Sequence, residues 1–381
     1  MSELGVGIVG YGFIGKVHAY CHKAMWFYYD PVPLKTRLVA VCTARPETAE
    51  RAKEHGGFEF ATTDYRELVE HPQVEIVHCC TPNKFHREVC VAALEAGKHV
   101  YCDKPLAMNV REAEEMVRAA ERSGKVHMVT FQYRFIPAIL RAKELVEEGR
   151  VGEVVTFRAA YLHSGYLDPE RPMSWRLRRE LAGGGALFDL GSHVIDLVHF
   201  LLGPIRRVFA VLKTFVTERP VSPGSPERAK VEVDDWAQLL VELEGGAVGT
   251  IEASRVATGA EDEIRFEAHG TKGAFYFNSM DPNWLYFFEG TAPEVPLGGE
   301  RGFKRIASIQ RYPEPARLPP RNASIGWVRY HVACLFEFLR AIAEGREAEP
   351  SFRAGLEAQR VLEAALVSAR EGRWVDLSEV G

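Results

Sequence analysis

Residues 183–197, GGGALFDLGSHVIDL, place two carboxylates and an imidazole in a largely apolar segment. If the segment is helical, offsets of four and three residues bring Asp189, His193 and Asp196 onto one face. An imidazole with a pKa of about 6.5 can move a proton near neutral pH, and a carboxylate can orient a hydroxyl group. A buried polar network, with one Asp paired to an arginine such as Arg176, is the simpler alternative. A metal site would need a ligand beyond one Asp and one His.

A second chemical candidate is the lysine of Cys102-Asp103-Lys104-Pro105, which follows the apolar run 99–102. The proline disfavours helical geometry at Lys104, so this residue is expected to be extended at the end of a strand. There its ammonium group could hydrogen-bond a reacting oxygen and stabilise developing negative charge. An ordinary surface lysine is the alternative interpretation.

The glycine pattern GYGFIG at residues 10–15 lies between an apolar run, 5–9, and a segment of helical character, KVHAYCHKAMWF. A strand, this turn and a helix together predict a dinucleotide-binding site, with the pyrophosphate at the helix N-terminus. The residues expected to contact the cofactor in this turn are Gly10, Gly12, Phe13, Ile14 and Gly15.

The first third of the chain alternates short apolar strands with helices. Strands are expected at 38–42, 76–80, 99–102 and 126–130, and helices at 46–55, 65–70, 86–96 and 110–123. This alternation predicts a doubly wound parallel sheet, in which ligands bind beyond the carboxyl ends of the strands.

Three strand ends therefore supply further cofactor candidates. Thr43 and Arg45 follow the second strand where an acidic residue would favour NAD, so the prediction is NAD(P) with a preference for NADP. Thr81, Pro82, Asn83 and His86 follow the third predicted strand; helix capping is the alternative role of Asn83 and His86. Asp103 and Lys104 complete the set.

The sequence pattern changes after residue 135, where long strands replace the alternation of short strands and helices. A helix at 137–148 is followed by long strands at 154–161, 208–216, 237–243, 248–253, 264–269 and 274–277, and helices at 325–344 and 354–371 close the chain. Segments 217–230 and 291–322 are expected to be irregular. We predict an α/β protein with a Rossmann domain at 1–135. A second α/β domain at 136–381 has a large, mainly antiparallel open sheet, and its C-terminal helices can pack back on the first domain.

The composition limits the functional classes. The chain has 381 residues, 46% of them hydrophobic, and a formal charge of −5, which argues against nucleic-acid binding. Neither an apolar run of about 20 residues nor a signal-peptide pattern is evident, so no membrane partner and a cytoplasmic location are expected. Seven cysteines without a CxxC pair indicate reduced thiols and argue against a zinc ribbon. No metal is expected.

Five motifs in order, GYGFIGKVH, TPNKFH, CDKPLAMN, YRF and GGGALFDLGSHVIDL, resemble the Gfo/Idh/MocA oxidoreductase family. The resemblance implies that Lys104 is the catalytic lysine and that Asp189 and His193 are the paired acidic and histidine positions. Asp103 stands where the family usually has Glu, which keeps the carboxylate. The resemblance further implies that the open sheet serves oligomerisation, as a homodimer or homotetramer. Asp196 is expected to be structural.

The leading hypothesis is an NAD(P)-dependent dehydrogenase acting on CH-OH groups of a sugar, anhydrosugar or cyclitol. Oxidising a secondary alcohol removes a proton from oxygen and a hydride from carbon, which suits this polar set. The alternatives are a trans-dihydrodiol or aldose-type oxidoreductase, and a non-catalytic cofactor-binding sensor. The residues expected to line the substrate pocket are Tyr133, Arg134, His163, Trp175 and Arg176, with Tyr166 also plausible.

Overall fold

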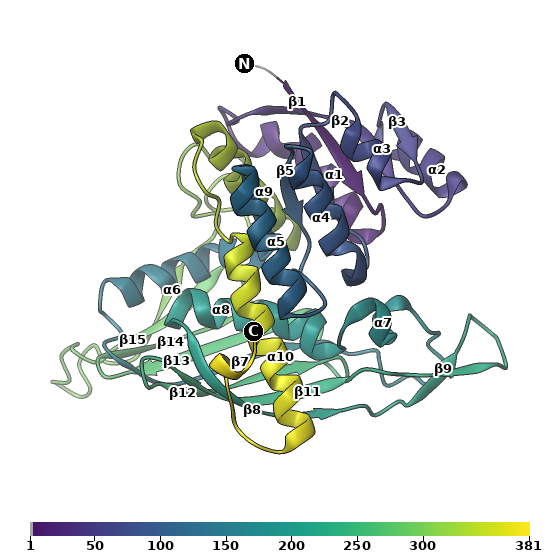
Figure 1. Cartoon of the computed structure of the whole chain (residues 1–381). Helices are drawn as coiled ribbons and strands as arrows, with labels where there is room; N and C mark the ends of the chain where they lie inside the picture. Colours follow the sequence, from purple (N-terminus) through teal and green to yellow (C-terminus); the bar gives the residue numbers. More distant parts are fainter. Residues whose placement is uncertain (1–2) are drawn as a thin grey trace. The chain divides into compact units, whose positions relative to one another are not determined.

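The computed structural model describes residues 3–381 and divides the chain into two compact units. Unit 1 contains the residues through Phe135 together with Tyr312–Pro320 and Gly326–Gln359. Unit 2 contains Ile136–Arg311, Arg321–Ile325 and Arg360–Gly381. Figure 1 shows the course of the chain, and each unit is described by itself below.

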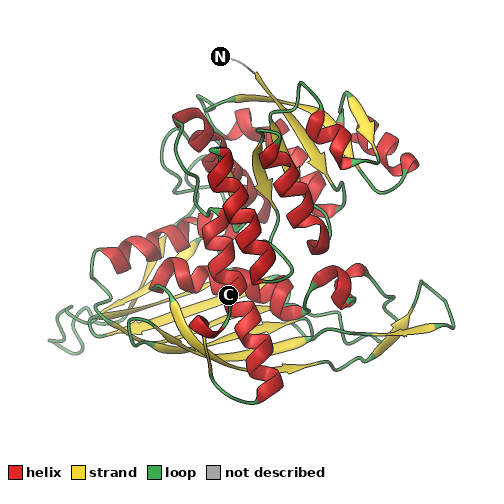
Figure 2. Ribbon diagram, viewed as in Figure 1, coloured by secondary structure: helices red, strands yellow, loops and turns green. Residues whose placement is uncertain are grey.

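Unit 1 is built on a parallel sheet of short buried strands, with helices between successive strands (Figure 2). Its spatial order is β3-β2-β1-β4-β5-β6, so the strand order reverses next to β1. The strands are β1 (Glu3–Val9), β2 (Lys35–Cys42), β3 (Phe60–Thr62), β4 (Ile76–Cys79), β5 (His99–Cys102) and β6 (His127–Val129). Ligands bind at such reversal points, beyond the strand ends.

The helices of unit 1 follow the strands as the apolar pattern predicts. They are α1 (Phe13–Tyr28), α2 (Pro46–Gly56), α3 (Tyr65–Glu70), η1 (Asn83–Phe85), α4 (His86–Glu95), α5 (Val110–Ser123), η2 (Gln132–Phe135) and α9 (Trp327–Glu344). Asn109 caps α5 by accepting the Glu112 N–H at 2.9 Å, and Gly124 ends it in left-handed geometry.

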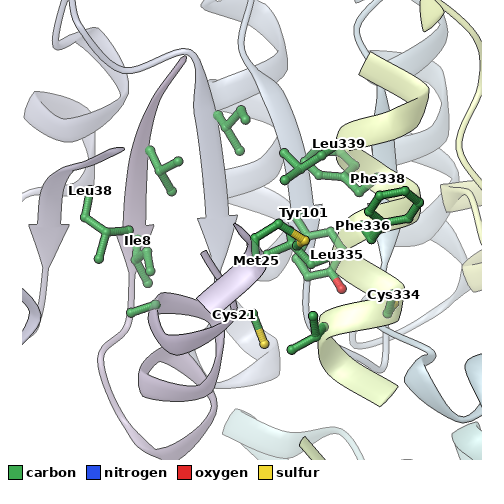
Figure 3. Close-up of a cluster of buried hydrophobic side chains, with 14 of the residues drawn as sticks. Ile8, Cys21, Met25, Leu38, Tyr101, Cys334, Leu335, Phe336, Phe338 and Leu339 are labelled. Atoms are coloured by element: carbon green, nitrogen blue, oxygen red, sulfur yellow. The ribbon is translucent and has the colours of Figure 1, made fainter. Parts of the chain in front are cut away.

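The core of unit 1 joins segments that are distant in the sequence. Side chains of β1, β2, β5 and α1 pack with Leu335, Phe338 and Leu339 of α9 (Figure 3). These three α9 side chains are almost completely removed from solvent. Burial of large apolar side chains contributes roughly 1.5–3 kcal/mol each, so α9 is an integral layer of this unit.

A row of buried histidines lies between α1 and β4. His22 Nε2 is 2.9 Å from His78 Nε2, and His78 Nδ1 is 3.1 Å from His18 Nδ1. The row ends at Thr36 on one side, 2.9 Å from His22, and at Cys80 on the other, 3.1 Å from His18. Burial lowers the pKa of all three imidazoles, that of His22 to about 3, so the row is neutral at pH 7.

Unit 2 is built on a large, mainly antiparallel sheet in the order β16-β15-β14-β13-β7-β12-β11-β8-β17. Its one parallel pair among the described strands joins β7 to β12. The strands are β7 (Val154–Leu162), β8 (Ile205–Lys213), β11 (Trp236–Leu243), β12 (Val248–Ser254), β13 (Glu263–Gly270), β14 (Gly273–Asn278), β15 (Trp284–Glu289), β16 (Phe303–Ala307) and β17 (Val375–Asp376). A separate hairpin pairs β9 (Glu218–Pro220) with β10 (Arg228–Lys230).

The helical elements of unit 2 include α6 (Pro137–Glu147), η3 (Trp175–Leu177), α7 (Arg179–Ala182), the π-helical turn η4 (Leu187–Gly191), α8 (Ser192–Leu202) and η5 (Leu377–Glu379). Helix α8 packs on β7 and β12, and α6 packs on β14 and β15. The boundary between the units falls within α10 (Phe352–Glu371). The stretch Arg179–Leu202 is long and apolar enough for a membrane span, but 78% of its most apolar window is buried inside the structure.

The predicted fold class is confirmed, and several local expectations were wrong. The segment 217–230 contains the β9–β10 hairpin, and 291–322 contains β16. The strands β3, β15 and β17 were not expected. Each of these strands pairs with a neighbouring strand, and in 217–230 and 291–322 prolines, glycines and charges mask the local pattern.

Candidate active site

The predicted cofactor turn connects β1 to α1 and uses each glycine differently. Gly10 has φ +91°, and a Cβ there would lie 2.4 Å from the Cys80 carbonyl oxygen. A Cβ on Gly15 would lie 2.1 Å from the Gly10 carbonyl oxygen, so helix and turn pack directly on each other. A Cβ on Gly12 would meet nothing within 4 Å. The open side of the turn is therefore at Gly12, where the fingerprint places the pyrophosphate.

The N-terminus of α1 is suited to an anion. Among the described residues, neither an acidic side chain nor a side-chain cap occupies its first turn. The first N–H groups of a helix have no intrahelical acceptor, and the helix dipole favours negative charge there. Phe13 and Ile14 supply such N–H groups next to the open side of Gly12, and the Phe13 side chain is exposed. These residues fit the pyrophosphate of a dinucleotide.

The end of β2 presents the two residues that were predicted to select NADP. Thr43 donates to the Arg45 carbonyl at 3.1 Å and lies 2.6 Å from the Thr48 hydroxyl. Arg45 is the N-cap residue of α2, and its side chain is exposed. The guanidinium group is thus accessible to a ligand, and the loop carries no carboxylate that would bind ribose hydroxyls.

The ends of β4 and β5 are tied together by His86. Its Nδ1 is 2.9 Å from the Pro105 carbonyl and its Nε2 is 3.1 Å from the Thr81 carbonyl. The imidazole is fully buried, so it positions the two segments rather than offering itself to solvent. Of the predicted cofactor residues, Asn83 is buried, whereas Thr81, Pro82, Asp103 and Lys104 are partly exposed.

In unit 2, a buried carboxylate explains the triple glycine. Asp234 accepts the N–H groups of Gly185 and Leu187, each at 2.8 Å. A Cβ on Gly185 would lie 1.8 Å from the Asp234 carbonyl oxygen, so glycine allows this close backbone approach. Burial raises the pKa of the Asp234 carboxyl, and the two backbone hydrogen bonds oppose this shift. The start of η4 is thereby fixed against the sheet.

Asp189 lies within η4 and is held by arginine. Arg255 Nη2 donates to Asp189 Oδ2 at 2.9 Å, and Arg176 Nε is 3.8 Å from the same oxygen. The Arg255 side chain is 2% exposed and its guanidinium lies 5.0 Å from the Tyr166 ring centroid, whereas Asp189 is 27% exposed. Burial alone would lower the pKa of Arg255, but Asp189 and other neighbours raise it, so the arginine stays charged.

His193 follows Asp189 by four residues and is the second residue of helix α8. Its imidazole is 4% exposed and lies edge-to-face against Tyr161, with ring centroids 5.7 Å apart. The Tyr161 hydroxyl donates to Asp262 Oδ1 at 2.5 Å, and His163 Nε2 is 2.8 Å from the same oxygen. Unit 2 thus brings Asp189, His193 and the predicted His163 onto the sheet face that α8 covers.

The other predicted substrate residues are distributed between the units. Trp175 and Arg176 belong to unit 2, and the Arg176 guanidinium lies 4.6 Å from the Trp175 ring centroid. Tyr133 and Arg134 belong to unit 1. Tyr133 is 2% exposed and accepts the Trp327 Nε1–H at 3.2 Å, and Arg134 is 3.7 Å from Glu349.

Sequence reasoning missed Arg255, Asp234 and Asp262. Arg255 directly follows β12, Asp262 directly precedes β13, and Asp234 lies two residues before β11. All three are polar residues next to the ends of strands, and this is the sequence signal that could have identified them.

Unit 1 has a glycine turn that fits a pyrophosphate, and unit 2 has a polar cluster on its sheet. These two features are typical of a two-domain dinucleotide-dependent oxidoreductase. The chain belongs to the Gfo/Idh/MocA oxidoreductase family. Residues 4–131 match the family model for an oxidoreductase family with an NAD-binding Rossmann fold, and residues 139–276 match the GFO/IDH/MocA C-terminal domain. The resemblance inferred from the motifs is confirmed.

Similar proteins extend over the whole chain. Levoglucosan dehydrogenase of Pseudarthrobacter phenanthrenivorans is 36% identical over 100% of both chains, and myo-inositol 2-dehydrogenase of Thermotoga maritima is 27% identical over 98% of this chain and 99% of its own. A solved structure of levoglucosan dehydrogenase with NADH and levoglucosan has a TM-score of 0.92 and 36% identity, covering 99% of this chain and 100% of the other. These similarities support an NAD-dependent dehydrogenase.

Proposed function

We propose that this protein is a dehydrogenase that oxidises a secondary hydroxyl group of a cyclic sugar, anhydrosugar or cyclitol. One observation carries the proposal. Buried Arg255 fixes the carboxylate of Asp189, and the imidazole of His193 follows four residues later. Similar proteins are named for levoglucosan, myo-inositol and 1,5-anhydro-D-fructose, which are all polyhydroxylated rings or their derivatives. Unit 1 is proposed as the cofactor domain and unit 2 as the main substrate domain.

In this proposal, His193 is the residue that accepts the proton of the reacting hydroxyl group. A bound nicotinamide cofactor exchanges the hydride with the reacting carbon. The His193 imidazole takes the proton of the reacting hydroxyl, and its burial excludes competing water. By the family resemblance, Lys104 is proposed as the catalytic lysine, whose ammonium group can stabilise the negative charge that develops on oxygen as the proton leaves.

Asp189 is proposed to orient the substrate. The hydrogen bond from Arg255 to Oδ2 fixes the carboxylate, which is 27% exposed and can accept a hydrogen bond from a hydroxyl next to the reacting one. Among the described residues, Nε and Nη1 of Arg255 are buried and have no hydrogen-bond partner, so a substrate oxygen or an ordered water is the acceptor they require. His163, Trp175, Arg176, Tyr133 and Arg134 are proposed as further pocket residues.

The nicotinamide cofactor is proposed to be NAD or NADP, with Arg45 deciding the affinity for NADP. The exposed guanidinium at the N-cap of α2 favours a 2′-phosphate, which was the basis of the predicted NADP preference. The solved structure of levoglucosan dehydrogenase named above contains NADH, so the comparisons do not support that preference. A cytoplasmic enzyme is proposed on the basis of its reduced, buried cysteines.

A homo-oligomer is proposed to form through the open face of the unit 2 sheet. Val211, Leu240 and Val248 are 50%, 43% and 44% exposed on neighbouring strands β8, β11 and β12. Apolar side chains that cluster on one sheet face favour association with a second copy.

The test is an activity screen with both cofactors. Purified protein is mixed with NAD or NADP and with levoglucosan, myo-inositol, glucose, L-sorbose and a trans-dihydrodiol, and formation of the reduced nicotinamide is followed by absorbance. We expect turnover with at least one cyclic polyol and none with the dihydrodiol. Activity with the dihydrodiol alone would support the trans-dihydrodiol alternative. Tight cofactor binding without turnover of any polyol would favour the sensor alternative.

A further inference from the structure

Three of the buried cysteines converge in unit 1. The Sγ atoms of Cys79, Cys90 and Cys102 all lie within 4.8 Å of one another, and each residue is 0% exposed. Cys79 and Cys102 are register partners on the adjacent parallel strands β4 and β5, so their side chains emerge on the same face. Cys90 reaches that face from α4, which covers it. The sequence spacing of 11 and 12 residues has no familiar metal-ligand pattern.

We infer that these three thiols form a binding site for a divalent, thiophilic metal ion of the zinc and cadmium type. Zinc–sulfur bonds of about 2.3 Å require sulfur atoms about 3.8 Å apart in a tetrahedral site. Sulfur atoms already within 4.8 Å reach that geometry with small side-chain rotations. Each thiol releases its proton to solvent as its sulfur binds the metal.

A hydroxyl group lies beside one of the three thiols. The Thr81 Oγ1 atom is 3.4 Å from the Cys79 Sγ atom, close to the separation of two ligands on one tetrahedral ion. The inferred site therefore has three sulfur ligands, with a hydroxyl oxygen beside one of them. Three thiolates with a divalent ion have a net charge of −1, and with a monovalent ion a net charge of −2. Because burying the smaller charge costs less free energy, the divalent ion is favoured.

The position of the site links it to the proposed cofactor loops. Cys79 and Cys102 are the last residues of β4 and β5, and the segments with Thr81–Asn83 and Asp103–Lys104 follow them directly. An ion at this point would join the two strand ends and α4 in one coordination sphere. A consequence for cofactor affinity rests on the proposed function, whereas metal binding itself does not.

Cadmium serves as the probe because it binds sulfur tightly and is visible by nuclear magnetic resonance. Reduced full-length protein is incubated with excess Cd²⁺ for hours, since entry into a buried site requires local opening. Unbound ion is removed by gel filtration. Bound cadmium is counted by atomic emission, and its ligands are identified from the ¹¹³Cd chemical shift and the sulfur-to-cadmium charge-transfer absorbance.

The matched variants are Cys90→Ala and Cys334→Ala, which each remove a fully buried cysteine from a helix of unit 1. We expect one Cd²⁺ per chain with a three-sulfur resonance in the wild type and in Cys334→Ala. Cys90→Ala should bind cadmium at least ten-fold more weakly. No bound cadmium in the wild type, a resonance without three sulfur ligands, or equal binding by both variants would overturn the inference. The wild-type resonance decides the question even if Cys90→Ala fails to fold.

Discussion

Asp189 is held in place by a guanidinium group that enters from another strand end. A buried Arg255 fixes one carboxylate oxygen, and Tyr161 fixes one face of the His193 ring. Such contacts restrict the rotamers of both side chains before substrate arrives, which lowers the entropy lost on binding. At the residue scale, the cluster in unit 2 is thus held in one arrangement, as the proposed orienting and proton-transfer roles require.

The residue-scale prediction concerns Lys104 and His193. Lys104→Ala and His193→Ala should each lower kcat by about 10²–10⁴-fold, because each removes a group that is proposed to take part in the proton-transfer step. Cofactor affinity, measured by nicotinamide fluorescence, should change little in His193→Ala, because His193 belongs to unit 2 and is not one of the predicted cofactor residues. Asp196→Asn is the control. Because Asp196 is 1% exposed, its loss should lower Tm and leave kcat nearly unchanged. Near-normal turnover of His193→Ala would leave the proton acceptor unidentified.

Arg45 permits a separate test of cofactor choice. Hydrogen bonds to charged groups contribute about 1.5–3 kcal/mol, so Arg45→Ala should weaken NADP binding by roughly ten-fold or more. NAD lacks the 2′-phosphate, so its affinity should stay within a factor of about two. Titration calorimetry with both cofactors measures the difference. Equal effects on NAD and NADP would show that Arg45 is a surface residue of α2 without a role in selection.

At the element scale, different glycines of the β1–turn–α1 unit are expected to serve cofactor binding and folding. Gly12→Val places its side chain in open space, so Tm should change by no more than a few degrees while NAD(P) affinity falls at least ten-fold. Gly15→Val is the matched control, because its Cβ would lie 2.1 Å from the Gly10 carbonyl oxygen. That variant should lose stability as well as binding, as seen by circular dichroism melting. Undiminished cofactor binding by Gly12→Val would place the pyrophosphate elsewhere.

The whole molecule carries a pH dependence to which the histidine row contributes together with His99 and His127, whose pKa values burial lowers to about 4. His18, His22 and His78 have pKa values lowered by burial, so they remain neutral in the folded state while the unfolded chain takes up protons below pH 6.5. The free energy of unfolding must therefore fall as pH falls through 6.5. Between pH 7.5 and 5.5 each histidine accounts for about 1.4 kcal/mol, or about 4 kcal/mol for three.

Urea unfolding at several pH values measures this dependence. His22→Asn should reduce the slope of stability against pH by about one proton, whatever its effect on absolute stability. His269, which is 46% exposed, is the matched control: His269→Asn should leave the slope unchanged. A flat profile between pH 7.5 and 5.5 would show that the buried row takes up protons in the folded state.

Association belongs to the same scale. Leu240→Lys puts a charge on the exposed face of β11 and should shift the proposed homo-oligomer toward monomer in sedimentation or light scattering. Leu167→Lys, at a comparably exposed apolar residue in the loop before η3, should leave the assembly intact. A wild-type protein that is monomeric at micromolar concentration contradicts the proposal.

Much of the fold could be read from the sequence because it rests on local signals. The helices 65–70 and 110–123 and the strand 99–102 coincide with their predicted bounds, since capping residues and apolar periodicity act within a few residues. The glycine turn was equally local. By contrast, Asp189 lies in a π-helical turn, which alters the angular offset from His193 that a regular α-helix implies.

The sequence by itself determined the two-domain class, the cofactor turn and the family, because each depends on residues that are neighbours in the chain. The tertiary structure alone decided which side chains meet. It paired Asp189 with Arg255, 66 residues away, and brought Cys79 and Cys102 of the sheet together with Cys90 of α4. Such contacts follow from strand register and helix packing, which depend on long-range burial of apolar surface, so no local pattern encodes them.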